Sequence, residues 1–357
     1  MRFCKRSNRA TTECIEQRLH RREIETRMSE SNAGDNGEPL KSASWLNRIN
    51  ANVLFAVTPE YADVQAARGR DYGQKPTFNR PPSMPLAYKA IAGVEIRYAH
   101  QGSAEKPTVI LLNPLPQSIL AFAPIWNRLA SRFNLYAYDL PGFGRSEGGE
   151  EFMTFEAQGR FLRDFISEFG IEKPHLVGPD VGMAAALAYV THFPSDVASL
   201  VIGDGPGIAP SQNGSVINKM VDSGFWRLIF KIAGAGTFVH AANELGYLNY
   251  VPNEEEISDY IYSYSGRIGP ITTWFEKYPE SLRYVDPKLA EIDKPVLIFW
   301  GAQDKLLLAE NAERLKERLQ RSKAHIFERC GHFSYQDQHE KFGDLITEWV
   351  EGGYRLI

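Results

Sequence analysis

The chain has 357 residues, of which 43% are hydrophobic and 24% are charged, and its formal net charge is −4. This composition is typical of a globular protein, and the acidic balance gives no indication of nucleic acid or an anionic membrane as a partner. Three cysteines without a C-x-x-C pair exclude a disulfide framework and favour a reducing, cytoplasmic location, and no apolar run approaches the roughly 18 residues of a membrane span.

Residues 1–84 are interpreted as an N-terminal extension. Residues 1–30 are crowded with arginine and glutamate and contain no apolar core for a secretory signal, which favours a polar, partly disordered segment. Residues 44–56 are typical of a short helix, and we expect this helix to dock on the main body.

From residue 85 onward, apolar runs of strand length alternate with segments of helical periodicity. This alternation predicts a mostly parallel sheet covered by helices on both faces, built from residues 85–207 and 291–357. The expected strands lie at residues 86–90, 94–99, 108–112, 134–138, 175–177, 200–204, 295–300 and 324–327, and helices are expected at residues 155–169, 310–319 and 339–350.

Residues 208–290 interrupt this alternation, because they contain no buried-strand run and are helix-like and rich in aromatic residues. They are inserted after the sixth strand, at the carboxyl edge of the sheet, where open α/β sheets bind their ligands. We therefore expect a helical cap over the site and, from its composition, a largely apolar small-molecule substrate.

Asp180 stands at the apex of a sharp turn. An apolar strand leads into Gly178-Pro179-Asp180-Val181-Gly182, and a helix rich in small residues follows. The small flanking residues allow a turn that pushes one polar side chain beyond the sheet edge, as in a nucleophile elbow. A carboxylate is already ionised at neutral pH, so it can attack a saturated carbon without a base and form an ester. The alternative reading is that Asp180 only caps the following helix.

The order of elements resembles the α/β-hydrolase superfamily, and most closely its branch of epoxide hydrolases and haloalkane dehalogenases. The resemblance covers roughly residues 85–350. It rests on the elbow and on three further motifs in the expected order, namely Asn113-Pro114-Leu115-Pro116-Gln117, Asp139-Leu140-Pro141-Gly142-Phe143-Gly144-Arg145-Ser146, and Gly301-Ala302-Gln303-Asp304 followed by Gly331-His332-Phe333.

The resemblance implies roles for individual residues. Asp180 would be the nucleophile, and His332, held by Asp304, would activate the water that cleaves the ester. The backbone N–H groups of Leu115 and Val181 would form the oxyanion hole. Asp204 also follows a strand and is the alternative acid partner of His332. No cofactor is implied, and no cluster of histidines and carboxylates beyond this triad suggests a metal.

Two departures bear on the substrate. Val181 and Leu115 replace the side chains that usually bind a halide in the dehalogenases, which disfavours dehalogenation. Epoxide opening in that family uses tyrosines of the cap, and we expect Trp274, Tyr278 and Tyr264 to contact the substrate. The leading hypothesis is therefore an epoxide hydrolase-like enzyme; the alternatives are a haloalkane or haloacid dehalogenase and a ligand-binding protein of the same fold. The sequence does not indicate an oligomeric state.

Overall fold

The computed structural model describes residues 46–53, 58–79 and 84–354. Residues 47–357 form one compact unit; residues 1–46 form another, of which only Leu46 is described. The expected disorder of the first residues lies outside the described part of the chain. Residues 46–53 are helical, and Ala51 in this helix belongs to the buried hydrophobic cluster. None of the helices in the described ranges has the length and apolarity needed to cross a membrane.

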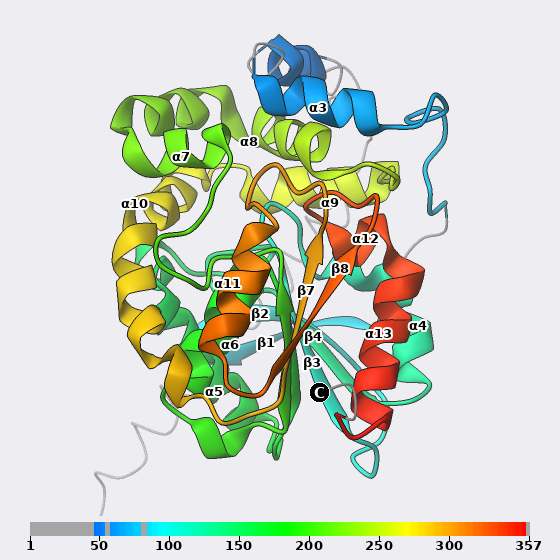
Figure 1. The fold of residues 1–357 in the computed structure, drawn as a ribbon, viewed down its shortest axis with the longest axis vertical. Helices are drawn as coiled ribbons and strands as arrows, with labels where there is room; N and C mark the ends of the chain where they lie inside the picture. The colour runs from blue at the N-terminus through cyan, green and yellow to red at the C-terminus, as the bar shows by residue number, and fades with distance from the viewer. Residues whose placement is uncertain (1–45, 54–57, 80–83, 355–357) are drawn as a thin grey trace, which may run out of the picture. The chain divides into compact units, whose positions relative to one another are not determined.

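Eight strands form one sheet in the order β1-β2-β4-β3-β5-β6-β7-β8 (Figure 1). The pairs β1/β2 and β2/β4 are antiparallel, and the other neighbours are parallel. The strands are β1 (Leu86–Ile91), β2 (Val94–Gln101), β3 (Thr108–Leu112), β4 (Asn134–Tyr138), β5 (His175–Pro179), β6 (Ser199–Gly203), β7 (Val296–Gly301) and β8 (Ser322–Phe327).

Burial explains why the central strands read as continuous apolar runs. Every residue of β5, β6 and β7 is buried, because helices cover both faces of the sheet. Helices α4 and α13 lie on one face, and α5, α6 and α11 lie on the other (Figure 1). These helices are α4 (Ala123–Ala130), α5 (Phe155–Glu168), α6 (Val181–Val190), α11 (Glu310–Arg318) and α13 (His339–Glu351), with the short α12 (Ser334–Asp337) before α13.

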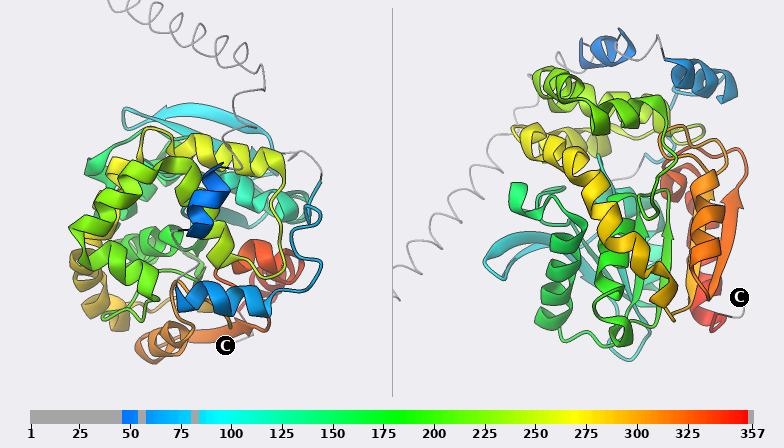
Figure 2. Two further views of the ribbon diagram at one scale, coloured as in Figure 1. Left: turned by 90° about the horizontal axis from the view of Figure 1, so that it is seen from above. Right: turned by 60° about the vertical axis from the view of Figure 1, so that its left-hand side comes forward.

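The segment after β6 is helical, as predicted. It contains α7 (Ser215–Asp222), α8 (Gly224–Gly246), α9 (Glu254–Tyr264) and α10 (Ile268–Val285). Helix α8 bends at Gly234, whose φ of +79° is a left-handed conformation that glycine adopts readily. Seen from above, α7 to α9 extend over one end of the sheet (Figure 2). Helix α3 (Pro59–Ala67), which precedes β1, packs against α8.

Short 3-10 turns complete the described chain: η1 (Ile119–Phe122), η2 (Glu150–Phe152), η3 (Pro194–Asp196) and η4 (Asp286–Glu291). The turn η1 matters for the site, because it ends the loop that connects β3 to α4 and that contains Leu115.

Candidate active site

Asp180 lies between β5 and α6 in a strained backbone conformation, with φ 49° and ψ −120°. The two glycines of the motif make this turn possible. A Cβ atom on Gly178 would lie 2.4 Å from the carbonyl oxygen of Gly182, and one on Gly182 would lie 2.8 Å from Leu112. The Asp180 side chain makes no capping hydrogen bond to α6. The interpretation that the Asp180 side chain only caps the following helix is therefore excluded, and its carboxylate is available for other contacts.

The two oxygens of Asp180 have different surroundings. Oδ2 accepts a hydrogen bond from the backbone N–H of Leu115 at 2.7 Å. Oδ1 lies 3.7 Å from Nε2 of His332, which is longer than a hydrogen bond. One oxygen is thus held by a backbone donor, while the other is not bound by the imidazole.

His332 is oriented by Asp304. Its Nδ1 atom lies 2.8 Å from Oδ2 of Asp304, so Nδ1–H can donate to this carboxylate while Nε2 faces Asp180. Oδ1 of Asp304 accepts the backbone N–H groups of Leu306 and Leu307 at 2.8 and 3.0 Å. Burial disfavours a charged imidazole, but the negative charges of Asp304 and Asp180 outweigh this effect and raise the pKa of His332 well above its usual value.

Asp204, the alternative acid, does not contact His332. Its carboxylate accepts the backbone N–H of Gly301 at 3.0 Å, and the backbone N–H and hydroxyl groups of Ser334. Burial and the nearby charge of Asp304 raise its pKa well above the usual range. Asp204 thus joins the ends of β6 and β7 to the segment after His332, and Asp304 is the carboxylate beside the imidazole.

The loop after β3 presents the Leu115 amide to Asp180. Asn113 directly follows β3, and its Oδ1 accepts the N–H of Leu140 at 2.7 Å. This bond ties the loop to the turn after β4, while the Leu115 N–H points to Asp180. Val181 is the first residue of α6, where backbone N–H groups have no partner within the helix.

A small cavity lies against Asp180 and His332. Among the described residues that line it, Asp180 and His332 are the only ionisable ones. The remaining wall is almost entirely apolar. The core contributes Leu115, Pro116, Leu306 and Phe333; the cap contributes Val216, Ile217 and Met220 from α7 and Phe230, Phe238, Ala241, Ala242 and Leu245 from α8.

The three cap residues expected to contact the substrate do not line this cavity. The ring of Trp274 packs between Phe143 and Phe155. The Tyr264 hydroxyl donates to the carbonyl of Gln117 at 2.7 Å. The Tyr278 hydroxyl donates to Asn213 at 3.2 Å. Trp274 and Tyr264 thus join the cap to the core, whereas the Tyr278 hydrogen bond lies within the cap, and none of the three side chains lies in the described wall of the cavity.

The cap wall that does line the cavity was missed at the sequence level. Phe238, Ala241, Ala242 and Leu245 follow the spacing of one helical face, which is a usable signal. Three of these four side chains are aliphatic and carry no polar group that would mark them as substrate contacts. In the described ranges, no group of three or more histidine, cysteine, aspartate or glutamate residues has a geometry that could hold a metal ion.

Comparisons with known proteins agree with this architecture. Residues 107–338 match the family model of the alpha/beta hydrolase fold. The chain is 24% identical to a 2-hydroxy-6-oxo-6-phenylhexa-2,4-dienoate hydrolase of Burkholderia cepacia, over 63% of this chain and 79% of that protein. Among solved structures, the epoxide hydrolase CorEH (TM-score 0.67, 22% identity) covers 76% of this chain and 99% of its own. The haloalkane dehalogenase DbeA of Bradyrhizobium elkani (TM-score 0.67, 22% identity) covers 77% and 100%.

Proposed function

From the premise that this chain belongs to the α/β-hydrolase-fold family and is a hydrolase of that fold, we propose that it works through a covalent ester on Asp180. The observation that carries the proposal is the unequal environment of the two carboxylate oxygens. A backbone N–H holds Oδ2, while Oδ1 lies 3.7 Å from Nε2 of His332, which is longer than a hydrogen bond. A carboxylate in this position can attack carbon without an activating base.

In the first step, Oδ1 of Asp180 forms a bond to a saturated carbon of the substrate, and the leaving group departs with the bonding electron pair. In the second step, Nε2 of His332 takes a proton from water, and the water oxygen attacks the ester carbon of Asp180. The negative charge that develops on Oδ2 is stabilised by the Leu115 N–H. Collapse of this intermediate releases the substrate as an alcohol, which takes the proton from His332. The carboxyl group of Asp180 keeps the second proton of the water molecule and releases it to solvent, which restores the carboxylate.

We propose an epoxide on a largely apolar molecule as the substrate. The apolar wall of the cavity favours an apolar body. The oxygen that leaves an epoxide carbon stays on the substrate and can take a proton from water. A departing halide ion instead needs N–H donors, and apart from His332 the cavity wall offers no side-chain N–H among the described residues that line it.

Trapping the ester tests the proposal. The His332→Gln variant lacks the base for the second step, so incubation with styrene oxide is expected to add the full mass of the epoxide to the peptide that contains Asp180. A matched incubation with 1-bromohexane distinguishes the dehalogenase, because its adduct would have lost the elements of hydrogen bromide. If neither compound labels Asp180 and Asp180→Asn leaves ligand affinity unchanged, the ligand-binding alternative replaces the enzymatic one.

A further inference from the structure

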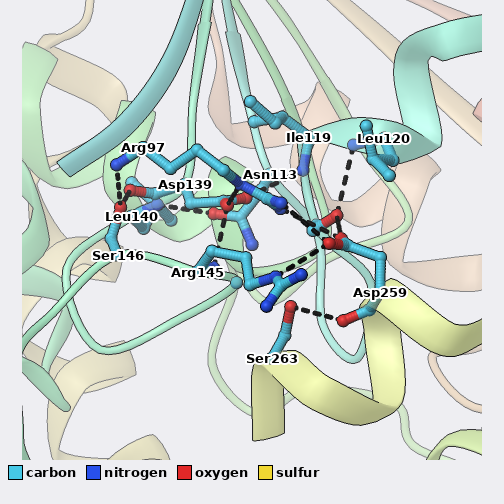
Figure 3. A network of polar contacts seen from close by, with 12 residues as sticks. Arg97, Asn113, Ile119, Leu120, Asp139, Leu140, Arg145, Ser146, Asp259 and Ser263 are labelled. Carbon is cyan, nitrogen blue, oxygen red and sulfur yellow. Dashed lines mark hydrogen bonds and ion pairs between the residues drawn. The ribbon is translucent and has the colours of Figure 1, made fainter. Parts of the chain in front are cut away.

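Four buried or partly buried charged side chains meet where the cap joins the core, outside the cavity wall (Figure 3). Arg97 comes from β2, Asp139 follows β4, Arg145 lies in the next loop, and Asp259 comes from the cap helix α9. The two positive and two negative charges balance. The proposed reaction uses none of these four groups directly.

The guanidinium of Arg97 bridges core and cap. Its Nη1 and Nη2 atoms donate to the two oxygens of Asp259 at 2.8 and 3.0 Å, and its Nε donates to Asp139 at 2.6 Å. The Nε atom of Arg145 donates to Asp259 at 2.9 Å. Burial alone would raise the pKa of Asp259, but the charges of Arg97 and Arg145 outweigh it and lower this pKa to about 2. The paired geometry fixes both the position and the plane of the Asp259 carboxylate.

The same two carboxylates hold the loop that presents the Leu115 amide. The Ser118 hydroxyl donates to Oδ2 of Asp259 at 2.5 Å, and the Ile119 N–H donates to Oδ1 of Asp139 at 2.8 Å. The carbonyl of Gln117 accepts the hydroxyl of Tyr264, which also lies on α9. The cap helix and Asp139 therefore fix three consecutive residues that closely follow Leu115, namely Gln117, Ser118 and Ile119.

Stability alone does not account for this arrangement. Replacing a buried ion pair by packed apolar side chains is often neutral or stabilising, so charges buried at such a place serve a geometric purpose in some proteins. Here the charges orient a donor that lies three residues from Leu115, whose N–H is 2.7 Å from Asp180. Oxyanion donors act only when they are held at the correct distance from the developing charge.

We propose that Asp259 is a positioning residue of the cap, which holds the Leu115 amide on Asp180 through the Ser118 hydroxyl. This inference rests on the proposed function. Once the ester has formed, Oδ2 is its carbonyl oxygen, and it gains negative charge again only during ester hydrolysis. Misplacement of the Leu115 N–H therefore slows hydrolysis of the ester and leaves its formation nearly unchanged.

The test compares Ser118→Ala with Ser263→Ala. The Ser263 hydroxyl donates to the backbone carbonyl of Asp259 at 2.8 Å and makes no hydrogen bond to the described residues of the loop, so it is a matched control (Figure 3). With styrene oxide, Ser118→Ala is expected to lower the rate constant of ester hydrolysis by about tenfold, less than the about hundredfold loss when an oxyanion donor is removed. Ester formation should stay within about twofold, so intact-protein mass shows the ester accumulating during turnover. Ser118→Thr, which keeps the hydroxyl, is expected to restore hydrolysis.

A second variant addresses Asp259 itself. Asp259→Asn alone would leave the buried Arg97 with Asp139 as its only carboxylate partner and would unbalance the charges of the cluster, which endangers folding. The pair Arg97→Gln/Asp259→Asn removes one charge of each sign and the paired guanidinium bonds that fix the side chain at position 259, so it is expected to accumulate the ester as Ser118→Ala does. Equal hydrolysis rate constants in Ser118→Ala and Ser263→Ala would overturn the inference.

Failure of the proposed function is distinguishable from failure of this inference. If the wild-type enzyme and His332→Gln form no ester, the proposed function fails, and deuterium exchange of the peptide over residues 113–119 still decides the positioning role. Faster exchange in Ser118→Ala but not in Ser263→Ala supports the role of Asp259. Unchanged exchange in both variants contradicts it.

Discussion

The charge on His332 depends on the number of charged carboxylates around it, and this number falls when Asp180 becomes an ester in the proposed reaction. In the free enzyme, Asp304 and Asp180 both favour the imidazolium form and raise the pKa of His332. Conversion of Asp180 to an ester removes one of these charges, so the imidazole of the ester intermediate releases its proton more readily. The neutral base is thus favoured in the step that needs it.

This coupling predicts a difference between two midpoints. A base must be neutral, so ester hydrolysis is expected to be slow at low pH and to accelerate as the pH rises through the pKa of His332 in the ester. We expect that midpoint, measured by single-turnover kinetics, to lie below the pKa of His332 in the free enzyme, measured by NMR. Asp304→Asn removes a negative charge beside the imidazole, so it should lower the pKa of His332 in the free enzyme, measured by NMR, below the wild-type value. A kinetic midpoint at or above the free-enzyme pKa would contradict the coupling.

The sequence could not distinguish Asp304 from Asp204 on physical grounds, since each follows a buried strand at the same edge of the sheet. The difference arises from loop geometry. Asp204 has a positive φ of 47° and its carboxylate binds Gly301 and Ser334, whereas Asp304 faces His332. The position of Asp180 at a sharp turn could be predicted, because the glycines around it are needed for the turn and their spacing is visible in the sequence.

At the scale of elements, the cap has two parts with different roles. Helices α7 and α8 supply the apolar wall of the cavity. Helix α9 instead contributes Asp259 and Tyr264, which bind the loop beside Asp180. Its first turn is a capping box in which Asn253 and Glu256 satisfy each other's backbone N–H groups. We infer that α7 and α8 set the size of the substrate, whereas α9 holds the reacting geometry.

Substitution in α8 tests this division. Phe238→Ala removes a ring from the cavity wall and is expected to change kcat/KM in favour of a bulky epoxide over a small one by about tenfold, the scale of discrimination by apolar contacts. Phe225→Ala is the matched control, because Phe225 lies in the same helix and is 65% exposed. An equal change of the ratio in both variants would show that α8 does not set substrate size.

The element order and the position of the cap could be predicted, because strands buried on both faces read as short apolar runs that helical segments separate. The residues of the cavity wall could not be predicted from the sequence. The aliphatic residues of α7 and α8 have the pattern of any core-facing helix, and only tertiary packing decides which of them face Asp180. Trp274 shows the opposite case: it was expected to contact the substrate, but its ring fills space between α10 and the core.

At the scale of the whole molecule, a buried carboxyl group makes stability depend on pH. Glu256 is 1% exposed and binds the Tyr250 hydroxyl at 2.6 Å and Gln336 at 3.0 Å. Burial raises its pKa from 4.5 to about 7. The raised value means that Glu256 favours the folded state fully below its unfolded pKa, and that this contribution is lost as the pH rises through about 7.

Urea unfolding at pH 5 and pH 8 tests this dependence. The contribution of Glu256 to the free energy of unfolding is expected to fall between these values by up to about 3 kcal/mol, from a change of roughly two pKa units. Glu256→Gln cannot ionise, so it should lose this part of the difference. If the variant and the wild type lose the same stability between the two pH values, the carboxyl of Glu256 does not titrate in this range.

The central claim concerns where the oxygen of water enters the enzyme. Wild-type enzyme turning over styrene oxide in oxygen-18 water is expected to accumulate the label in the Asp180 carboxylate, because each hydrolysis places a water oxygen on this side chain. Peptide mass spectrometry after many turnovers should find the label in that peptide alone, while the product of a first single turnover still contains the original Asp180 oxygen. Turnover that labels the product directly and leaves Asp180 unlabelled would contradict the account.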